Sequence, residues 1–226
     1  MNKKQSFLFL VFLLPFLSFS QSRDLWQWST LSIDKKITPS LSFIFDEELR
    51  LQNNLSEVNL FYSNIGAGYK VNKYVKVAGV YRWINKNRKD SPYSSRHRFY
   101  ADVSFKYRMS PLVFSFRTRI QTQVRDVYSS DSGLVPENYW RNKFDLKLDM
   151  NRRFAPYVAA EFRYQFNNSR IKEANNQFDR GRYYIGLDYE INRVNTAGVY
   201  YMIQRDYNVN DPETDYVLGI AYSLSL

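Results

Sequence analysis

Residues 112–125 alternate between apolar and polar side chains over an unusually long stretch. One parity carries Leu112, Phe114, Phe116, Ile120 and Val124, and the other carries Ser115, Arg117, Arg119, Gln121, Gln123 and Arg125. A period of two indicates a β-strand with one apolar and one charged face. Strands usually have about 5 or 6 residues. A tilted strand of the present length, at ~3.3 Å per residue, crosses the hydrocarbon core of a bilayer.

The same alternation continues to the last residue of the chain. Its final apolar face contains Tyr216, Leu218, Ile220, Tyr222, Leu224 and Leu226. A soluble sandwich or lipocalin-type barrel shows the same alternation with the apolar face turned inward, so periodicity alone leaves both architectures open.

The N-terminus predicts export. Lys3 and Lys4 precede an apolar run over residues 7–19, which is too short for a transmembrane helix. We therefore expect residues 1–20 to be a cleaved signal peptide and residues 21–226 to form one barrel domain. An uncleaved anchor helix is the alternative, which the short run disfavours. The chain contains no cysteine, so no disulfide framework supports it.

The remaining chain divides into strand-like segments joined by connections of unequal length. The predicted strands are 25–33, 39–50, 57–71, 74–86, 96–109, 112–125, 139–150, 155–168, 180–191, 195–207 and 215–226. Short turns alternate with longer polar loops at 87–95, 126–138, 168–179 and 208–214. Short periplasmic turns and long outer loops are typical of outer-membrane barrels. They favour a single transmembrane, antiparallel up-and-down barrel of about 10–12 strands in a bacterial outer membrane.

The strand count leaves a question about residues 25–33. Bacterial barrels normally have an even number of strands, and the segments from residue 39 onward already make ten. The first segment is therefore expected either inside the lumen or as part of a twelve-stranded wall.

Tryptophans fall near the predicted strand ends. Interfacial aromatic girdles of membrane barrels place such residues there, whereas ordinary strand propensity is the alternative explanation. We expect a girdle formed by Trp26, Trp28, Trp83 and Trp140.

Several short motifs resemble a family of bacterial outer-membrane β-barrels of unknown function, domain of unknown function 2490. They are Trp26-x-Trp28, residues 47–50, residues 96–99, residues 117–119, residues 161–163 and residues 179–183. The resemblance spans nearly all of the mature chain. It implies the barrel fold and the outer-membrane location, and it implies no activity, because none is established for the family.

The inward parity of the predicted strands is rich in charge. We expect a lumen charge network of Glu48, Arg98, Asp102, Arg117, Arg119, Asp145, Lys147, Glu161, Arg163 and Asp188. Charges of mixed sign can satisfy one another in a narrow, filled lumen, which favours a structural or accessory role. The alternative is a narrow pore that prefers anions, because rings of Arg and Lys select them.

Charge pairing also predicts the register of two hairpins. A turn that pairs Arg152 with Pro156 places Lys147 opposite Glu161 and Asp145 opposite Arg163, whereas a shift by two residues opposes two carboxylates. The hairpin of 96–109 and 112–125 brings Asp102 opposite Arg119 or Arg117.

A lipid-modifying enzyme is the third functional class. His97 is the only histidine and is predicted to face outward near the rim, as in barrel hydrolases, but position 99 is Phe and the expected neighbour Val124 offers no nucleophile. One histidine without cysteine does not make a usual transition-metal site. We therefore expect no catalytic residues, no metal and no cofactor.

The expected partners belong to the envelope. Lys86, Arg88, Lys89 and Arg96 flank a predicted outer loop, where they would meet the phosphates of outer-membrane lipid and lipopolysaccharide. A solvated charged loop is the alternative. A larger envelope complex is a further expected partner, whereas nucleic acid is not, because export explains the basic charge better.

Overall fold

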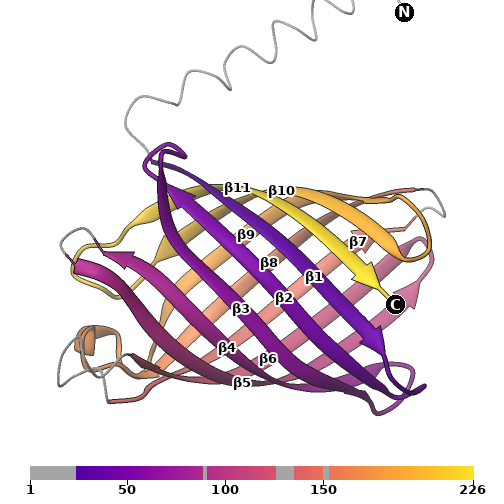
Figure 1. Ribbon diagram of the computed structural model, residues 1–226, viewed down its shortest axis with the longest axis horizontal. Coiled ribbons are helices and arrows are strands. Elements are labelled where there is room, and N and C mark those ends of the chain that lie inside the picture. Colours follow the sequence, from indigo (N-terminus) through magenta and orange to yellow (C-terminus); the bar gives the residue numbers. More distant parts are fainter. Residues whose placement is uncertain (1–23, 89–90, 126–134, 150–152) are drawn as a thin grey trace, which may run out of the picture.

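The computed structural model describes residues 24–88, 91–125, 135–149 and 153–226, which form a closed β-barrel (Figure 1). The strands are β1 (Leu25–Lys36), β2 (Leu41–Gln52), β3 (Glu57–Lys70), β4 (Val75–Arg88), β5 (Ser91–Met109), β6 (Leu112–Arg125), β7 (Glu137–Leu148), β8 (Phe154–Asn167), β9 (Gln177–Glu190), β10 (Asn195–Asp206) and β11 (Thr214–Ser225). A short 3₁₀ turn, η4 (Lys172–Ala174), lies between β8 and β9. The predicted all-β barrel is confirmed, whereas the predicted signal peptide lies outside the described residues.

The barrel closes between its first and last strands, which run parallel (Figure 1). β1 pairs with β11 from Leu25 opposite Tyr216 to Asp34 opposite Ser225, and it pairs with β2 in antiparallel orientation. Residues 25–36 therefore belong to the wall, and the expectations of an even strand number and of a segment in the lumen were wrong. An odd number makes the first and last strands point the same way. Parallel hydrogen bonding still satisfies their backbone groups, so no edge is left for lipid to cover.

The two ends of the barrel differ in their connections. The connections after β8 and β10 span residues 168–176 and 207–213, and they are long as predicted, whereas most of the loop predicted at 126–138 lies outside the described residues. The loop predicted at 87–95 was wrong, because β4 continues to Arg88 and β5 already begins at Ser91. Trp83 Nε1 donates to Ser95 Oγ at 2.7 Å within this extension. A barrel strand that projects beyond the apolar band is free to carry polar residues, so polarity did not mark its end.

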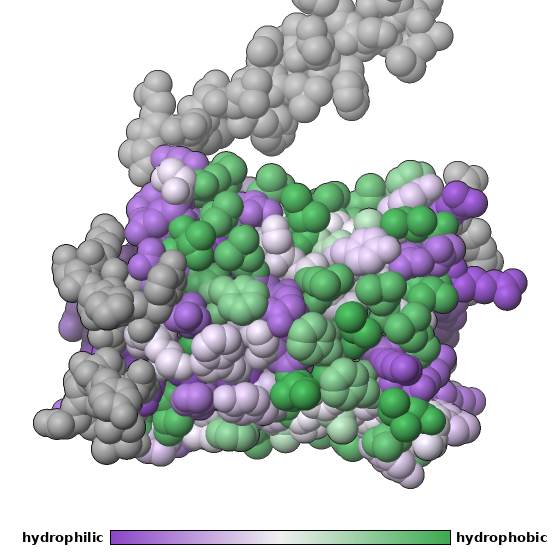
Figure 2. Space-filling view, in the orientation of Figure 1, coloured by the Kyte–Doolittle hydropathy of each residue, from purple (hydrophilic) through white to green (hydrophobic). Residues whose placement is uncertain are grey.

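Polar and apolar side chains are distributed in the reverse of a soluble protein. Ile120, Ile185, Phe99 and Phe144 are each more than half exposed on the outside, whereas Glu161 retains only 3% of its exposure inside. Hydrophobic side chains cover much of the visible wall, and hydrophilic ones gather toward the two ends (Figure 2). An apolar exterior of this extent requires a lipid covering, which decides against the soluble architectures. In the described part of the chain, no helix is long and apolar enough to cross a membrane.

The structure agrees with one of the two registers predicted for the β5–β6 hairpin and corrects that of the β7–β8 hairpin. Asp102 lies opposite Arg119, and His97 lies opposite Val124. In the β7–β8 hairpin, however, Lys143 lies opposite Glu161, and Lys147 lies opposite Tyr157. The predicted pairing was displaced by four residues. The observed register brings Glu161 between several arginines instead of opposite a single lysine, which compensates a buried carboxylate more fully.

Two inward-facing glycines make room for tyrosine rings. Gly219 lies opposite Tyr200, and Gly186 lies opposite Tyr157. A Cβ atom on Gly219 would lie 2.0 Å from the Tyr200 ring, and one on Gly186 would lie 2.5 Å from the Tyr157 ring. Each ring therefore rests directly on the backbone of the neighbouring strand, as in pairs where an aromatic residue covers a strand glycine. This placement keeps two large side chains close to the wall of the lumen.

Candidate functional site: a basic lumen

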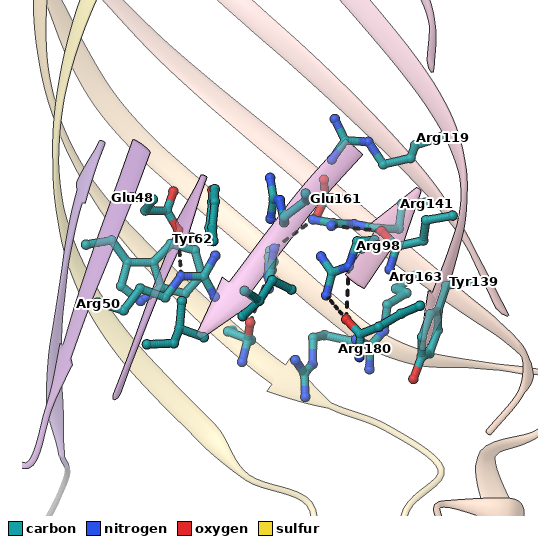
Figure 3. Close-up of a pocket in the computed structure, with 18 of the residues that line it drawn as sticks. Glu48, Arg50, Tyr62, Arg98, Arg119, Tyr139, Arg141, Glu161, Arg163 and Arg180 are labelled. Atoms are coloured by element: carbon teal, nitrogen blue, oxygen red, sulfur yellow. Dashed lines mark hydrogen bonds and ion pairs between the residues drawn. The ribbon is translucent and has the colours of Figure 1, made fainter. Parts of the chain in front are cut away.

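The lumen contains a cavity of about 670 Å³ that is lined by residues from every strand (Figure 3). Thirteen lysine and arginine residues and six aspartate and glutamate residues belong to its described lining. Alternation explains their position, because every second residue of a strand faces the same side of the sheet. The lining therefore has an excess of basic residues, although Asp102, Asp179 and Asp206, which are not part of it, bind three of its arginines.

Glu161 on β8 is the most heavily compensated carboxylate of the lumen. Arg117 on β6 donates to Glu161 Oε2 at 2.6 Å, Arg182 on β9 approaches Oε1 at 3.3 Å, and Arg141 on β7 also donates to Oε1. Only 4% of the Glu161 side chain is exposed. One anion on β8 thus joins three further strands, and the three cations around it exceed its charge.

Four arginines stand in register on consecutive strands. This arginine row consists of Arg119, Arg141, Arg163 and Arg180 on β6, β7, β8 and β9. Asp102 is in register with its first member and Asp206 with its last. Like charges directly opposite one another are destabilising, and a carboxylate bound to each arginine offsets this repulsion.

Each arginine of the row binds a carboxylate, and that of Arg141 is Glu161. Arg119 holds Asp102 through two hydrogen bonds of 2.7 Å, and Arg180 holds Asp206 at 2.6 and 3.1 Å. Arg163 Nε donates to Asp179 Oδ1 at 2.9 Å. These two-pronged contacts orient each guanidinium plane. The row is therefore a fixed array of charge, not a set of freely moving side chains.

Aromatic rings and arginines alternate along the other half of the wall. Arg50 stacks over Trp28 at 3.5 Å from the ring centroid, Arg82 over Tyr62 at 3.6 Å, and Arg119 over Tyr100 at 3.7 Å. Ring faces attract guanidinium groups and take up little of their hydrogen-bonding capacity. The stack thus holds arginines in place while it leaves their N–H groups available to the lumen.

The end with the long connections has its own polar cluster. Arg125 Nε donates to Glu137 at 2.6 Å, and Gln123 Nε2 donates to the same carboxylate at 2.9 Å. Asn168, at the start of the β8–β9 connection, donates to Tyr139 Oη at 2.9 Å, and Ile171 from this connection lines the cavity. The connection is therefore folded against the mouth of the lumen.

The predicted lumen residues lie on the inward parity, but several have other partners than expected. Glu48 binds Arg50 at 2.5 Å, and Lys147 binds Asp188. Arg163 binds Asp179, which had been assigned to a loop, and Asp145 lies opposite Ala159. The structure brings Asp102 together with Arg119 and Arg117 with Glu161. It does not bring Asp145 to Arg163, because the β7–β8 register differs.

The tryptophan girdle is contradicted at two of its four positions. Trp28 is 4% exposed and packs against Met202 and Val217, and Trp26 packs on the same inner cluster. Trp83 and Trp140 are exposed on the outer wall, where their membrane depth stays a prediction. The alternation of β1 places both of its tryptophans inward, although they lie near a strand end.

Two of the four basic residues predicted to meet lipid phosphates are also placed differently. Lys86 and Arg96 line the lumen, whereas the side chains of Arg88 and Lys89 are not described. The prediction was wrong for Lys86 and Arg96 because they lie on β4 and β5, at positions whose side chains face the lumen. Sequence analysis also missed the aromatic partners Tyr62, Tyr100 and Tyr139. Their inward parity beside arginines was the available signal.

His97 lies on the outside, as predicted, and the hydrogen-bond partner of its ring among the described residues is a tyrosine. Its Nδ1 is 2.7 Å from Tyr81 Oη, and its ring stacks on that tyrosine. Its cross-strand neighbours are Trp83 and Val124. No group of three or more potential His, Cys, Asp or Glu metal ligands occurs among the described residues.

The fold is shared with a porin of known structure. A NanC porin superposes with a TM-score of 0.55 at 15% identity, covering 91% of this chain and 100% of that chain. A KdgM porin gives a TM-score of 0.47 at 10% identity, covering 85% and 94% of the two chains. A comparison with curated proteins found no match. Residues 27–215 match a family model, and the chain therefore belongs to the family described as "Protein of unknown function (DUF2490)".

Proposed function

We propose that the protein is a porin-like channel of the bacterial outer membrane with a lumen that favours small acidic solutes. The observation that carries this proposal is the excess of basic over acidic residues around the cavity, thirteen against six. Rings of Arg and Lys select anions in pores. The apolar exterior of the barrel supports the membrane location, because it requires lipid around it.

The geometry of the lumen supports small solutes over large ones. A cavity of about 670 Å³ is within the range of ~300–1,000 Å³ that is usual for small-molecule sites. Arg119, Arg141 and their neighbours are fixed by ion pairs and ring stacking. An anion that enters therefore meets oriented donors, and no side chain has to be ordered when it binds.

Reversal potentials in planar bilayers test the proposal. Under a KCl gradient, the wild-type protein should conduct with a preference for chloride. Lys143→Gln removes a basic residue that lines the cavity, and it should reduce this preference. Arg205→Gln removes an exposed charge outside that lining, on the opposite parity from Gln204, and it should leave the preference unchanged. Cation preference of the wild-type channel would contradict the proposal.

A closed structural barrel is the second candidate. The bridging of β6, β7 and β9 by Glu161, and the position of Ile171 at the mouth, favour it. This candidate expects no unitary conductance in the bilayer experiment. Its role would be accessory, in a larger envelope complex, and co-purification from native outer membranes would identify the partner.

A further inference from the structure

Arg82 and Arg98 form a pair of lumen cations that differs from the arginine row. The two residues lie directly opposite each other on β4 and β5, and both line the cavity. Arg82 is 7% exposed. Among the residues that the structure describes, neither arginine has a carboxylate within 4.0 Å. Like charges in this position repel each other, and buried charges without a counter-ion are costly.

Each arginine is held by an amide instead of an acid. Arg82 Nε donates to Asn64 Oδ1 at 2.6 Å, and the amide nitrogen of Asn64 donates to Asp46 at 2.8 Å. Arg98 donates to Gln123 Oε1 at 3.0 and 2.5 Å, and Gln123 Nε2 donates in turn to Glu137 at 2.9 Å. In both cases a neutral side chain separates the guanidinium from the nearest acid in the chain of hydrogen bonds. The amides orient the arginines without neutralising them.

The remaining donors face the cavity. A guanidinium has five N–H donors, and the described contacts of Arg82 occupy only its Nε, with its plane stacked on Tyr62 at 3.6 Å. Its two terminal nitrogens donate to no protein acceptor in the described part of the chain. The Nη1 nitrogen of Arg98 likewise donates to no protein acceptor among the described residues. Two oriented guanidinium groups on directly opposed residues, each with unused donors, supply the charge and the hydrogen bonds that an oxyanion accepts.

We propose that Arg82 and Arg98 form a discrete binding site for a single oxyanion group, a carboxylate or a phosphate, carried by a solute in the lumen. The anion accepts hydrogen bonds from both guanidinium groups and relieves their mutual repulsion. Asn64 and Gln123 act as positioning residues. This inference deepens the proposed anion-preferring channel, since it names one site within a lumen that is basic throughout.

Calorimetric titration of the refolded, detergent-solubilised barrel with inorganic phosphate tests the site, and a parallel titration with acetate distinguishes the two oxyanions. We expect Arg82→Gln and Arg98→Gln each to weaken phosphate or acetate binding about tenfold or more, because each removes a charged hydrogen-bond partner. Lys143→Gln is the matched control. It removes one positive charge from the same cavity, and its side chain has no ion pair within 4.0 Å among the described residues. Its effect should be less than threefold.

Independent measurements separate the failure of the site from the failure of the channel. Each variant must first show the heat-dependent gel shift of a folded barrel. A chloride-preferring wild-type channel that binds neither anion would refute the site and retain the proposed function. Binding that depends on Arg82 and Arg98 in a barrel without anion preference would refute the function and retain the site. If Arg98→Gln and Lys143→Gln weakened anion binding equally, the site would also be refuted. The overall positive potential of the lumen would then explain the binding.

Discussion

Replacing Glu161 by Gln tests whether the central carboxylate holds the barrel together. The substitution keeps the shape of the side chain and removes its charge from Arg117, Arg141 and Arg182, which all bind it. Breaking a buried ion pair by removing one partner typically costs about 3–5 kcal/mol. Three arginines lose their counter-ion here, whereas water in the adjacent cavity relieves part of the cost. We therefore expect a loss of about 3 kcal/mol or more in the free energy of unfolding.

Asp188→Asn provides a matched control for this experiment. The Asp188 side chain is 22% exposed and binds Lys147, which is 34% exposed, whereas the Glu161 side chain is 4% exposed. Ion pairs open to solvent contribute about 0–1 kcal/mol, so this variant should lose little stability. Reversible urea unfolding in lipid vesicles measures both values, provided that the slope of the transition is unchanged. The reasoning is refuted if Glu161→Gln costs no more than Asp188→Asn.

Three further outcomes are expected. Ile120→Arg places a charge on an outer side chain that is 64% exposed, and it should lower the free energy of unfolding in vesicles by ~2–4 kcal/mol near mid-membrane; an unchanged value would contradict a lipid-facing position. Gly219→Ala brings a Cβ atom to 2.0 Å from the Tyr200 ring, so the ring should move into the lumen and reduce single-channel conductance, whereas equal conductance would mean that the ring does not limit the passage. Unboiled protein should migrate faster than boiled protein on SDS gels, and the protein should fractionate with the outer membrane. Recovery in the periplasmic fraction without a difference in migration would contradict the membrane location.

Much of the fold was accessible from local sequence, because a β-strand encodes its two faces residue by residue. Arg117, Arg119, Gln121 and Gln123 were predicted to face inward from parity alone, and they do. Short turns also transmit register reliably. The two-residue connection after Met109 leaves little freedom, and it places Asp102 opposite Arg119, one of the two partners that were predicted.

The same reasoning failed where strand ends lack a local signal. Polar residues after Ile84 suggested a loop, although the strands continue beyond the apolar band. In the β7–β8 hairpin, pairing of Lys147 with Glu161 satisfied the local charges, but the actual register satisfies Glu161 through Arg117 on β6 and Arg182 on β9. Charge pairing was considered only between the two strands of one hairpin. It therefore left out the arginines of other strands, which the curvature of the barrel wall brings close to Glu161.

The sequence by itself determined the strand character, the two faces of the wall and the basic lumen, because these follow from alternation and composition. Only the tertiary structure decided the number of strands and the arrangement of the arginines in the lumen. Parallel closure of β1 on β11 depends on two segments at opposite ends of the chain. The arginine row depends on the registers of four consecutive strands, and the opposition of Arg82 and Arg98 depends on that of β4 and β5. Registers are set by cooperative hydrogen bonding around a closed ring, so no single segment encodes them.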